Sequence, residues 1–326
     1  LVLVLGVVRM SFLLILWSYS RVRQNTHEYL RYPATLPPVS VVVPAHNEAA
    51  NIIAVIQSIL KNTYLPREII VIDDASTDET SAKIETMRAR YPRLIRTITF
   101  VENRGKAAAL NIGFLLTESP VVAALDGDTI LDYRALYNLV RHFNDSRVAA
   151  VAGEVHIANP RTMLGKFQEI EYTLSQRIEK EAFNAIGLVG VVPGAVGAWR
   201  RDDVLAAGGY AQNTLTEDQD LTIALLRRNR KIIYDREALA YTEAPATLRT
   251  FLRQRFRWTL GSMQCLWKHR GIMRRGSGWK LKLLLFPHNT LYGAVLPLFH
   301  PLADIYVIFL LATGSFSIVL ASYIIF

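Results

Sequence analysis

The sequence predicts an α/β protein with a mostly parallel, Rossmann-like sheet and helices on both faces of that sheet. Between residues 39 and 125, short β-branched runs alternate with segments that have the periodicity of amphipathic helices. Polar clusters follow the runs, as expected where the carboxyl ends of parallel strands form a ligand site. No repeat with a period of 20–50 residues is present, which excludes solenoids and propellers.

The alternation predicts the order of the elements. We expect strands over residues 39–43, 69–72, 95–101 and 121–125, and helices over residues 47–62, 78–90 and 106–117. Asp78 is expected to cap the second helix, because a carboxylate at that position accepts hydrogen bonds from the first free N–H groups. Helices of this length between strands are typical of parallel sheets covered on both faces.

Composition and charge exclude several classes of protein and favour one kind of partner. The chain has 326 residues, of which 51% are hydrophobic, and this excludes disordered and collagen-like classes. A single cysteine, Cys265, excludes a disulfide framework and a cysteine-based zinc site. Residues 227–282 carry a net charge of +12 and residues 1–38 carry +3, although the whole chain carries only +9. Basic stretches beside apolar runs favour membrane lipids, and not nucleic acid, as the partner.

Both ends of the chain are apolar. Residues 1–19 approach the roughly 20 residues that span a bilayer, although Arg9 interrupts them and needs a partner there. Residues 281–299 and 302–326 predict two further spans, and the start at Leu1 and the apolar end suggest a fragment of a longer protein. Arg21 and Arg23 predict that the following domain faces the cytoplasm, in a multi-pass protein of the plasma membrane.

Acidic residues gather at the predicted strand ends. Asp126, Gly127 and Asp128 follow the strand over residues 121–125, and Asp73 and Asp74 follow the strand over residues 69–72. Two carboxylates with a glycine between them can converge on a divalent cation that also holds a diphosphate. An ordinary acidic turn explains the same residues, and the position after a buried strand favours the cation site.

Several other residues have two interpretations. Lys106 starts a predicted helix, where it either receives a phosphate or is solvated, and His46 either contacts a base or is a polar loop residue. Trp199 either belongs to the core or forms a platform for a sugar. Residues 216–218, Thr-Glu-Asp, either form a helix cap or take part in chemistry. Residues 254–258 lie in a basic amphipathic stretch that is typical of a membrane-surface helix.

Taken in order, these motifs resemble the membrane-bound family 2 glycosyltransferases of the GT-A fold. The matching segments are PAHNE, DDAST, NRGKAAALN, DGD, TED and QRFRW, which begin at residues 44, 73, 103, 126, 216 and 254. They cover about residues 39–270, and DGD, TED and Q-x-x-R-W in this order form a specific signature. Most similar are the processive synthases of poly-N-acetylglucosamine, chitin, hyaluronan and cellulose.

The resemblance implies a role for each matching residue. The expected donor-binding residues are His46, Glu48, Asp74, Lys106 and Asp126, with Asp128 and Asp126 holding Mg²⁺ or Mn²⁺. Asp218 is expected to be the general base. The acceptor and the leaving diphosphate are expected to contact Glu217, Gln254, Arg257 and Trp258.

The apolar runs and the resemblance together give a domain plan. It consists of a transmembrane helix (1–20), a juxtamembrane linker (21–38), a cytosolic GT-A domain (39–247), an interfacial amphipathic segment (248–280) and a transmembrane region (281–326).

The implied reaction is inverting transfer of a sugar, N-acetylglucosamine by resemblance, from a UDP-sugar to a growing β-linked polysaccharide. One alternative is a non-processive transferase that adds one sugar to a lipid-linked acceptor. Another is a non-catalytic membrane scaffold, which would need none of the three aspartates Asp126, Asp128 and Asp218. No partner subunit can be named from the sequence.

Overall fold

A single mixed sheet organises the protein. The computed structural model describes residues 2–27, 35–158, 162–274 and 277–314. Within them lies an eight-stranded sheet of order β3-β2-β1-β4-β7-β6-β8-β5. The strands are β1 (Val39–Ala45), β2 (Glu68–Asp73), β3 (Ile95–Thr99), β4 (Val121–Ala124), β5 (Ile130–Leu131), β6 (Val148–Ile157), β7 (Gly197–Arg200) and β8 (Lys231–Thr242).

The first half of the sheet is parallel, as predicted. β1 pairs in parallel with β2 and β4, and β2 pairs in parallel with β3. Their registers place Ala45 beside Asp73, and Asp73 beside Thr99. The polar residues that follow β1, β2 and β4 therefore meet at one edge of the sheet, where a ligand site is expected.

The second half of the sheet contains the antiparallel pairings. β7 runs antiparallel to both β4 and β6, and β5 runs antiparallel to β8, although β6 and β8 are parallel. The glycine-rich segment before β7 brings the chain back along the sheet, so that β7 enters between β4 and β6 in the reverse direction. The sheet is therefore mixed.

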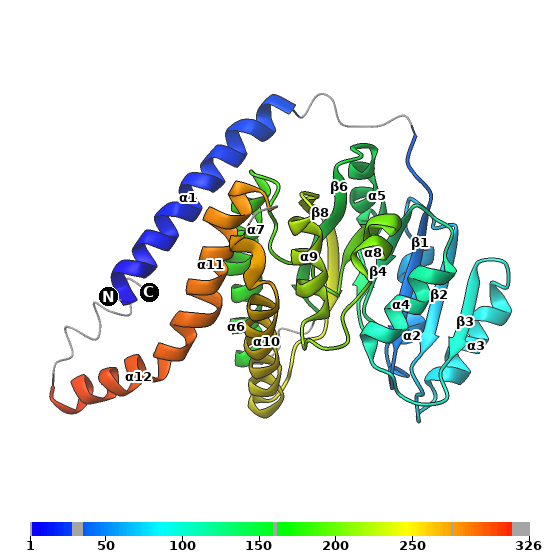
Figure 1. Cartoon of the computed structure of the whole chain (residues 1–326). Helices are drawn as coiled ribbons and strands as arrows, with labels where there is room; N and C mark the ends of the chain where they lie inside the picture. Colours follow the sequence, from blue (N-terminus) through cyan, green and yellow to red (C-terminus); the bar gives the residue numbers. More distant parts are fainter. Residues whose placement is uncertain (1, 28–34, 159–161, 275–276, 315–326) are drawn as a thin grey trace.

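Helices cover both faces of the sheet (Figure 1). The α-helices are α1 (Val2–His27), α2 (Ile52–Leu60), α3 (Thr80–Arg90), α4 (Lys106–Leu116), α5 (Ala135–Val140), α6 (Met163–Ile170), α7 (Arg177–Asn184), α8 (Arg201–Ala207), α9 (Glu217–Arg227), α10 (Leu248–Lys268), α11 (Phe286–Thr290) and α12 (Leu296–Ala312). Short 3₁₀ turns (Arg141–Asn144 and Arg270–Met273) and π segments (Glu171–Gln176, Leu281–Leu285 and Leu291–Val295) complete the helical structure of the described chain.

Successive side chains of β1 point to opposite faces of the sheet, and each face has its own hydrophobic core. Val41 and Val43 pack with buried residues of α2, α3 and α5, whereas Val42 packs with buried residues of α4, α8 and α9. Successive side chains of a strand point to opposite faces, so one apolar strand supplies both cores. Trp199 of β7 is 2% exposed and contacts Tyr210 edge to face, which assigns it to the core and not to a sugar platform.

Two helix boundaries differ from the expectation. The helix expected from residue 47 begins at Ile52, because Asn47 adopts a left-handed φ of 57° that an α-helix does not allow. α3 begins at Thr80, two residues after Asp78. Asp78 nevertheless accepts a 3.0 Å hydrogen bond from the backbone N–H of Thr80, so it satisfies a helix-start donor from just outside the helix.

α1 lies beside α7 and α11, away from the sheet (Figure 1). Arg9 of α1 has the partner that the sequence required, because its Nη2 lies 2.7 Å from Oε2 of Glu179 in α7. None of the described helices combines the length and the apolar character needed to cross a bilayer. The span expected over residues 302–326 extends beyond residue 314, outside the described part, and the expected spans stay predictions.

Candidate active site

The residues singled out from the sequence line one cavity of about 650 Å³ at the strand-end edge of the sheet. They come from the loops after β1, β2 and β4 and from the starts of α4 and α9, together with one face of α10. The set comprises His46, Glu48, Asp74, Lys106, Asp126, Asp128, Glu217, Asp218, Gln254, Arg257 and Trp258. Their common location is a finding, whereas the role of each stays a prediction.

The loops after β1 and β2 bind one another. The Nδ1–H of His46 donates to the carbonyl of Asp74 at 2.8 Å, and Oδ1 of Asn47 accepts from the backbone N–H of Thr77 at 2.9 Å. Asn47 and Ala75 both have a φ of 57°, a conformation that is uncommon outside glycine. This mutual bonding holds one wall of the cavity in a turn that neither loop would form alone.

Asp74 fixes the start of α4. Its two carboxylate oxygens accept hydrogen bonds from the backbone N–H groups of Arg104 and Gly105, at 2.7 and 2.8 Å. Lys106 follows directly as the first residue of α4. Asp74 lines the cavity and also holds the backbone that carries Lys106, whereas its contact with the donor stays a prediction.

The acidic pair after β4 lies against the β1 loop. A Cβ at Gly127 would lie 2.9 Å from Cγ of Glu48 and 3.0 Å from the carbonyl of Pro44, so only glycine allows this approach. Burial raises the pKa of Asp128, and the nearby charge of Asp126 raises it further. Burial also raises the pKa of Glu48, to which the carboxylates of Asp128, Asp126 and Glu243 contribute. This end of the cavity therefore holds an excess of negative charge.

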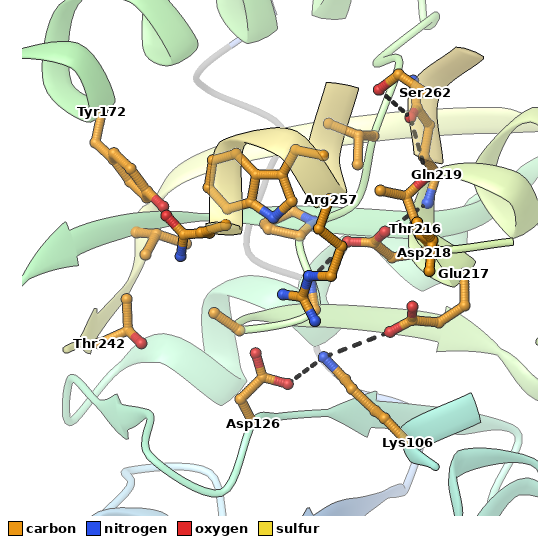
Figure 2. A pocket seen from close by; sticks show the side chains of 18 of the residues that line it. Lys106, Asp126, Tyr172, Thr216, Glu217, Asp218, Gln219, Thr242, Arg257 and Ser262 are labelled. Carbon is orange, nitrogen blue, oxygen red and sulfur yellow. Dashed lines mark hydrogen bonds and ion pairs between the residues drawn. The ribbon is translucent and has the colours of Figure 1, made fainter. Parts of the chain in front are cut away.

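Lys106 lies between the acidic pair and α9. Its Nζ is ion-paired with Oδ1 of Asp126 and lies 3.7 Å from Oε1 of Glu217 (Figure 2). Burial alone would lower the pKa of Lys106, but the carboxylates of Asp126, Glu217 and Asp218 outweigh it and raise the pKa. The amine is therefore a permanent cation at the place where a diphosphate would bring negative charge.

Asp218 has the environment expected of a general base. Its Oδ2 accepts a hydrogen bond from the backbone N–H of Gly194 at 3.2 Å, and its Oδ1 accepts one from Gln219 at 2.8 Å. Burial raises the pKa of Asp218 to about 6, with the Glu217 carboxylate as the second cause. Thr216 makes no side-chain cap to α9, so capping does not explain the Thr-Glu-Asp motif.

α10 presents the residues of the Q-x-x-R-W motif to the cavity. Figure 2 shows the guanidinium of Arg257 pointing into the cavity, toward the side that holds Lys106 and Asp126. Within the described chain, Arg257 has no hydrogen bond or ion pair, and Oε1 of Gln254 is buried without a hydrogen-bond partner. Both groups are therefore free to bind a ligand.

The ring of Trp258 is held from two sides. The guanidinium of Arg255 lies 4.6 Å from its ring centroid, and the ring of Tyr172 lies 6.3 Å away. Arg255 makes two 2.7 Å hydrogen bonds to the carboxylate of Glu171, which precedes Tyr172 in the π segment Glu171–Gln176. π-helical turns are frequent at functional sites, and this one orients the aromatic residue of the motif.

Sequence reasoning missed several residues that line the cavity. They are Arg9, Tyr172, Glu179, Lys180, Gly194, Thr242, Glu243 and His288, among others. Gly194 belongs to a glycine-rich segment, and a Cβ there would collide with Nζ of Lys106. Arg9 was noted only as a charge that needs a partner, and the others carry no local signal, because α1, α7, α11, the π segment and the end of β8 reach the cavity only through the tertiary fold.

The residues at this end of the cavity can bind a divalent cation only if a substrate supplies the remaining ligands. In the described part of the chain, no group of three histidine, cysteine or acidic residues is arranged to hold a metal by itself. Asp126 and Asp128 supply hard oxygen ligands at the end of the cavity where like charges raise the carboxylate pKa. Mg²⁺ is commonly bound by one or two carboxylates and completed by substrate phosphates, which matches this arrangement.

A parallel half-sheet whose strand ends hold paired aspartates, a partly exposed lysine and a carboxylate of raised pKa is the arrangement expected of a glycosyltransferase of the GT-A type. The comparisons with known proteins agree. A model described as glycosyltransferase-like family 2 matches residues 37–261, and the chain belongs to this family.

Two curated relatives are similar to the chain over most of its length. The chain is 29% identical over 252 residues to the poly-beta-1,6-N-acetyl-D-glucosamine synthase of Staphylococcus aureus (strain COL). It is 30% identical over 257 residues to the probable glycosyltransferase YdaM of Bacillus subtilis (strain 168). Each match covers 77% of this chain, and the chain spans only 61% of the length of each relative.

Two solved structures share the fold. One is a mannosyltransferase, PcManGT from Pyrobaculum calidifontis, in complex with GDP-Man and Mn²⁺. It matches with a TM-score of 0.72 and 21% identity, over 94% of this chain and 87% of that chain. The other is GalNAc-T7 with UDP, GalNAc and Mn²⁺. It matches with a TM-score of 0.54 and 16% identity, over 66% of this chain and 46% of that chain.

Proposed function

We propose that this family 2 glycosyltransferase moves N-acetylglucosamine from UDP-N-acetylglucosamine to a growing β-linked polysaccharide, with inversion at the anomeric carbon. The observation that carries the proposal is the order of groups along the cavity. A cationic lysine and paired aspartates lie at one end, Asp218 lies in the middle, and Trp258 lies on the helix opposite. The choice of sugar is supported by the name of the Staphylococcus aureus relative.

Asp218 performs the proton transfer. The acceptor hydroxyl gives its proton to the Asp218 carboxylate while its oxygen forms the new bond to the anomeric carbon. The bond between that carbon and the UDP oxygen breaks, and UDP leaves with the electron pair. The pKa near 6 suits this role, because a base works best when its pKa lies near the working pH. The N–H of Gly194 orients the carboxylate.

The leaving diphosphate meets cations from two directions. Lys106 lies at the start of α4, and Arg257 points toward the same region from α10. Asp126 and Asp128 would hold a divalent cation, Mg²⁺ or Mn²⁺, which supplies further charge neutralisation when it is bound. Stabilising charge that develops in the transition state is often the largest contribution to enzymatic rate enhancement.

The acceptor end is built for a sugar ring. Trp258 and Tyr172 offer aromatic faces, and the unpartnered oxygen of Gln254 can accept a hydrogen bond from a hydroxyl. Placing the terminal acceptor sugar there brings its hydroxyl toward Asp218 in the same cavity. The arrangement favours a saccharide acceptor, and a lipid-linked saccharide satisfies the same contacts.

We also propose that the protein works at the plasma membrane with its catalytic domain in the cytoplasm. The support is an exposed apolar stripe on α10, where Leu248, Leu252 and Phe256 are 64%, 56% and 68% exposed at four-residue intervals. Arginines alternate with the stripe, as in helices that lie at the surface of a bilayer. The apolar sequence over residues 1–19 and 281–326 supports the same location.

A donor screen tests the proposed reaction. The full chain, in detergent, is offered UDP-N-acetylglucosamine, UDP-glucose, UDP-galactose and GDP-mannose with Mg²⁺ or Mn²⁺, and UDP or GDP release is measured. The products are then sized and digested with linkage-specific glycosidases. Release of UDP from UDP-N-acetylglucosamine with formation of a β-linked product is expected. Preference for another donor would overturn the choice of sugar, and no release from any donor would overturn the reaction.

A further inference from the structure

The start of α9 is joined to the second half of α10 through a continuous set of contacts, which we call the α9–α10 seam. Its members are Leu215, Thr216, Gln219 and Asp220 on one side, and Gly261, Ser262, Gln264, Cys265, Lys268 and His269 on the other. The general base and the acceptor motif belong to these two helices. Four of the seam residues, Leu215, Thr216, Gln219 and Ser262, also line the cavity.

The outer part of the seam is a buried pair formed by a carboxylate and an imidazole, with a lysine beside it. Asp220 and His269 are 4% and 3% exposed, and Oδ1 of Asp220 lies 3.0 Å from Nε2 of His269. Nζ of Lys268 donates to Oδ2 of Asp220 at 2.9 Å. Burial alone would raise the pKa of Asp220, but the hydrogen bonds from His269 and Lys268 hold it below its usual value. Asp220 is therefore a charged carboxylate whose described partners are both at the end of α10.

The inner part of the seam is a close backbone approach. A Cβ at Gly261 would lie 2.6 Å from Cγ2 of Thr216 and 3.0 Å from its backbone nitrogen, so the two helices touch here without room for a methyl group. Beside this contact, the hydroxyl of Ser262 donates to Oε1 of Gln219 at 2.8 Å (Figure 2).

Because of helical geometry, these contacts determine how Asp218 on α9 and Trp258 on α10 lie relative to each other. Residues two apart on an α-helix point in nearly opposite directions, so Asp220 faces α10 when Asp218 faces the cavity. On α10, Gly261 follows Trp258 by three residues, less than one turn or about 4.5 Å along the axis. Any shift at Gly261 is therefore passed to Trp258 and Arg257 through a single turn of helix.

We propose that Asp220, with His269 and Lys268, and Gly261 are positioning residues that set the distance between the base Asp218 and the acceptor platform Trp258. The inference rests on the proposed function, because it assigns the base and the platform as that function does. The donor end is built from the loops after β1, β2 and β4 and from α4, and in the described part of the chain no seam residue is hydrogen-bonded or ion-paired to Lys106, Asp126 or Asp128. Loosening the seam should therefore affect the acceptor and spare the nucleotide.

Two variants loosen the seam in different ways. Asp220→Asn keeps the size of the side chain and removes its charge, and Gly261→Ala forces a methyl group against Thr216. Gly271→Ala is the matched control, because a Cβ there meets no atom nearer than 4.0 Å. Lys268→Met removes only the half-exposed member of the charged cluster, so it supplies a milder seam variant if either of the others fails to fold.

The full chain is assayed with UDP-N-acetylglucosamine as donor and β-1,6-linked N-acetylglucosamine oligosaccharides as acceptor. Four quantities are measured: kcat and KM for the acceptor, hydrolysis of the donor by water, the Kd of UDP and the melting temperature. Seam variants are expected to lose about 10–100-fold in kcat/KM for the acceptor, because small displacements of reacting groups have effects of this size. Donor hydrolysis should fall less than threefold, and the Kd of UDP should be unchanged.

Other results have distinct meanings. Equal losses of transfer and hydrolysis, in proportion to the fall in melting temperature, would show a merely structural role and overturn the inference. Seam variants that match Gly271→Ala in every quantity would also overturn it. A wild-type chain that transfers no sugar would overturn the proposed function, and the inference with it.

Discussion

Asp218 is hydrogen-bonded to Gly194, whose backbone N–H donates to Oδ2 of the carboxylate at 3.2 Å. The two residues are 24 positions apart in the chain and belong to different elements. Val192, in the same segment as Gly194, donates from its backbone to the hydroxyl of Thr222 in α9 at 3.1 Å. The glycine-rich segment and the first turn of α9 therefore form one wall of the cavity, with the carboxylate held at its surface.

Asp218→Asn should abolish transfer and leave donor binding intact. The amide keeps the size of the side chain and one acceptor oxygen, but it cannot take a proton, and general base catalysis supplies about 10²–10⁴-fold. We expect kcat to fall by that factor while the Kd of UDP, measured by calorimetry, stays within twofold. Asp203→Asn, which weakens the Arg230 ion pair outside the cavity, is the control. A near wild-type rate in Asp218→Asn would rule out Asp218 as the base.

The rate of transfer should fall on the acid side with an apparent pKa near 6. A base acts when it is deprotonated, so activity is lost as the pH falls through the pKa of Asp218, which is raised to about 6. Glu217→Gln removes a negative charge that raises this pKa, so the acid limb should move to lower pH. The measurement is kcat against pH between 4.5 and 8. An acid limb that stays in place in Glu217→Gln would contradict the assignment of this limb to Asp218.

Activity should require a divalent cation bound by Asp126 and Asp128. Removing a ligand carboxylate weakens both the metal and the diphosphate that completes its coordination. We expect excess EDTA to stop transfer, added Mg²⁺ or Mn²⁺ to restore it, and Asp128→Asn to lose most activity. Mn²⁺ binding in the presence of UDP, followed by electron paramagnetic resonance, gives a readout that does not depend on turnover. Full activity in EDTA would exclude a role for the cation.

Trp258→Ala should reduce polymer formation more than hydrolysis of the donor by water. Hydrolysis does not need the aromatic platform, whereas the terminal acceptor sugar loses its stacking surface, which is expected to cost tenfold or more in kcat/KM. Trp267→Ala is a matched control on the same helix, because Trp267 is 71% exposed and does not line the cavity. Equal losses in the two variants would show that Trp258 has no special contact with the acceptor.

The membrane assignment predicts which side of the bilayer carries the catalytic domain. In a Cys265→Ser background, a cysteine at the exposed position Arg90 should react with an impermeant maleimide only after the cells are permeabilised. Cysteines placed at Asp145 should behave in the same way. Labelling of either position in intact cells would place the domain outside and refute the topology.

Local chemistry was enough to predict the parallel half of the fold. β-branched runs such as residues 69–72 have few alternatives to a buried strand, and the polar clusters after them could be assigned to one edge because parallel strands end together. The start of α2 was placed five residues early, since nothing local shows that Asn47 turns into a left-handed conformation to bind Thr77. Tertiary bonds decide that boundary.

The antiparallel strands were not predictable in the same way. Residues 197–200 were not among the expected strands, and their pairing with β4 and β6 depends on partners up to 79 residues away. The residues on the far side of the cavity could not be predicted for the same reason. Lys180 and His288 line it because α7 and α11 pack beside α1, and periodicity in one helix does not show which neighbour it will meet.

The π segment Glu171–Gln176 gives the long helix from α6 to α7 a place that can absorb a change of length. A π turn holds more residues than an α turn, and this one lies between the outward-facing Phe167 and the cavity-lining Lys180. Deleting one residue from this segment would let the helix relax to α geometry while α6 and α7 keep their orientation, because the wider π turn already accommodates the extra residue. The same deletion within α6 would rotate α7 by about 100° relative to the start of α6 and exchange the α7 side chains that line the cavity.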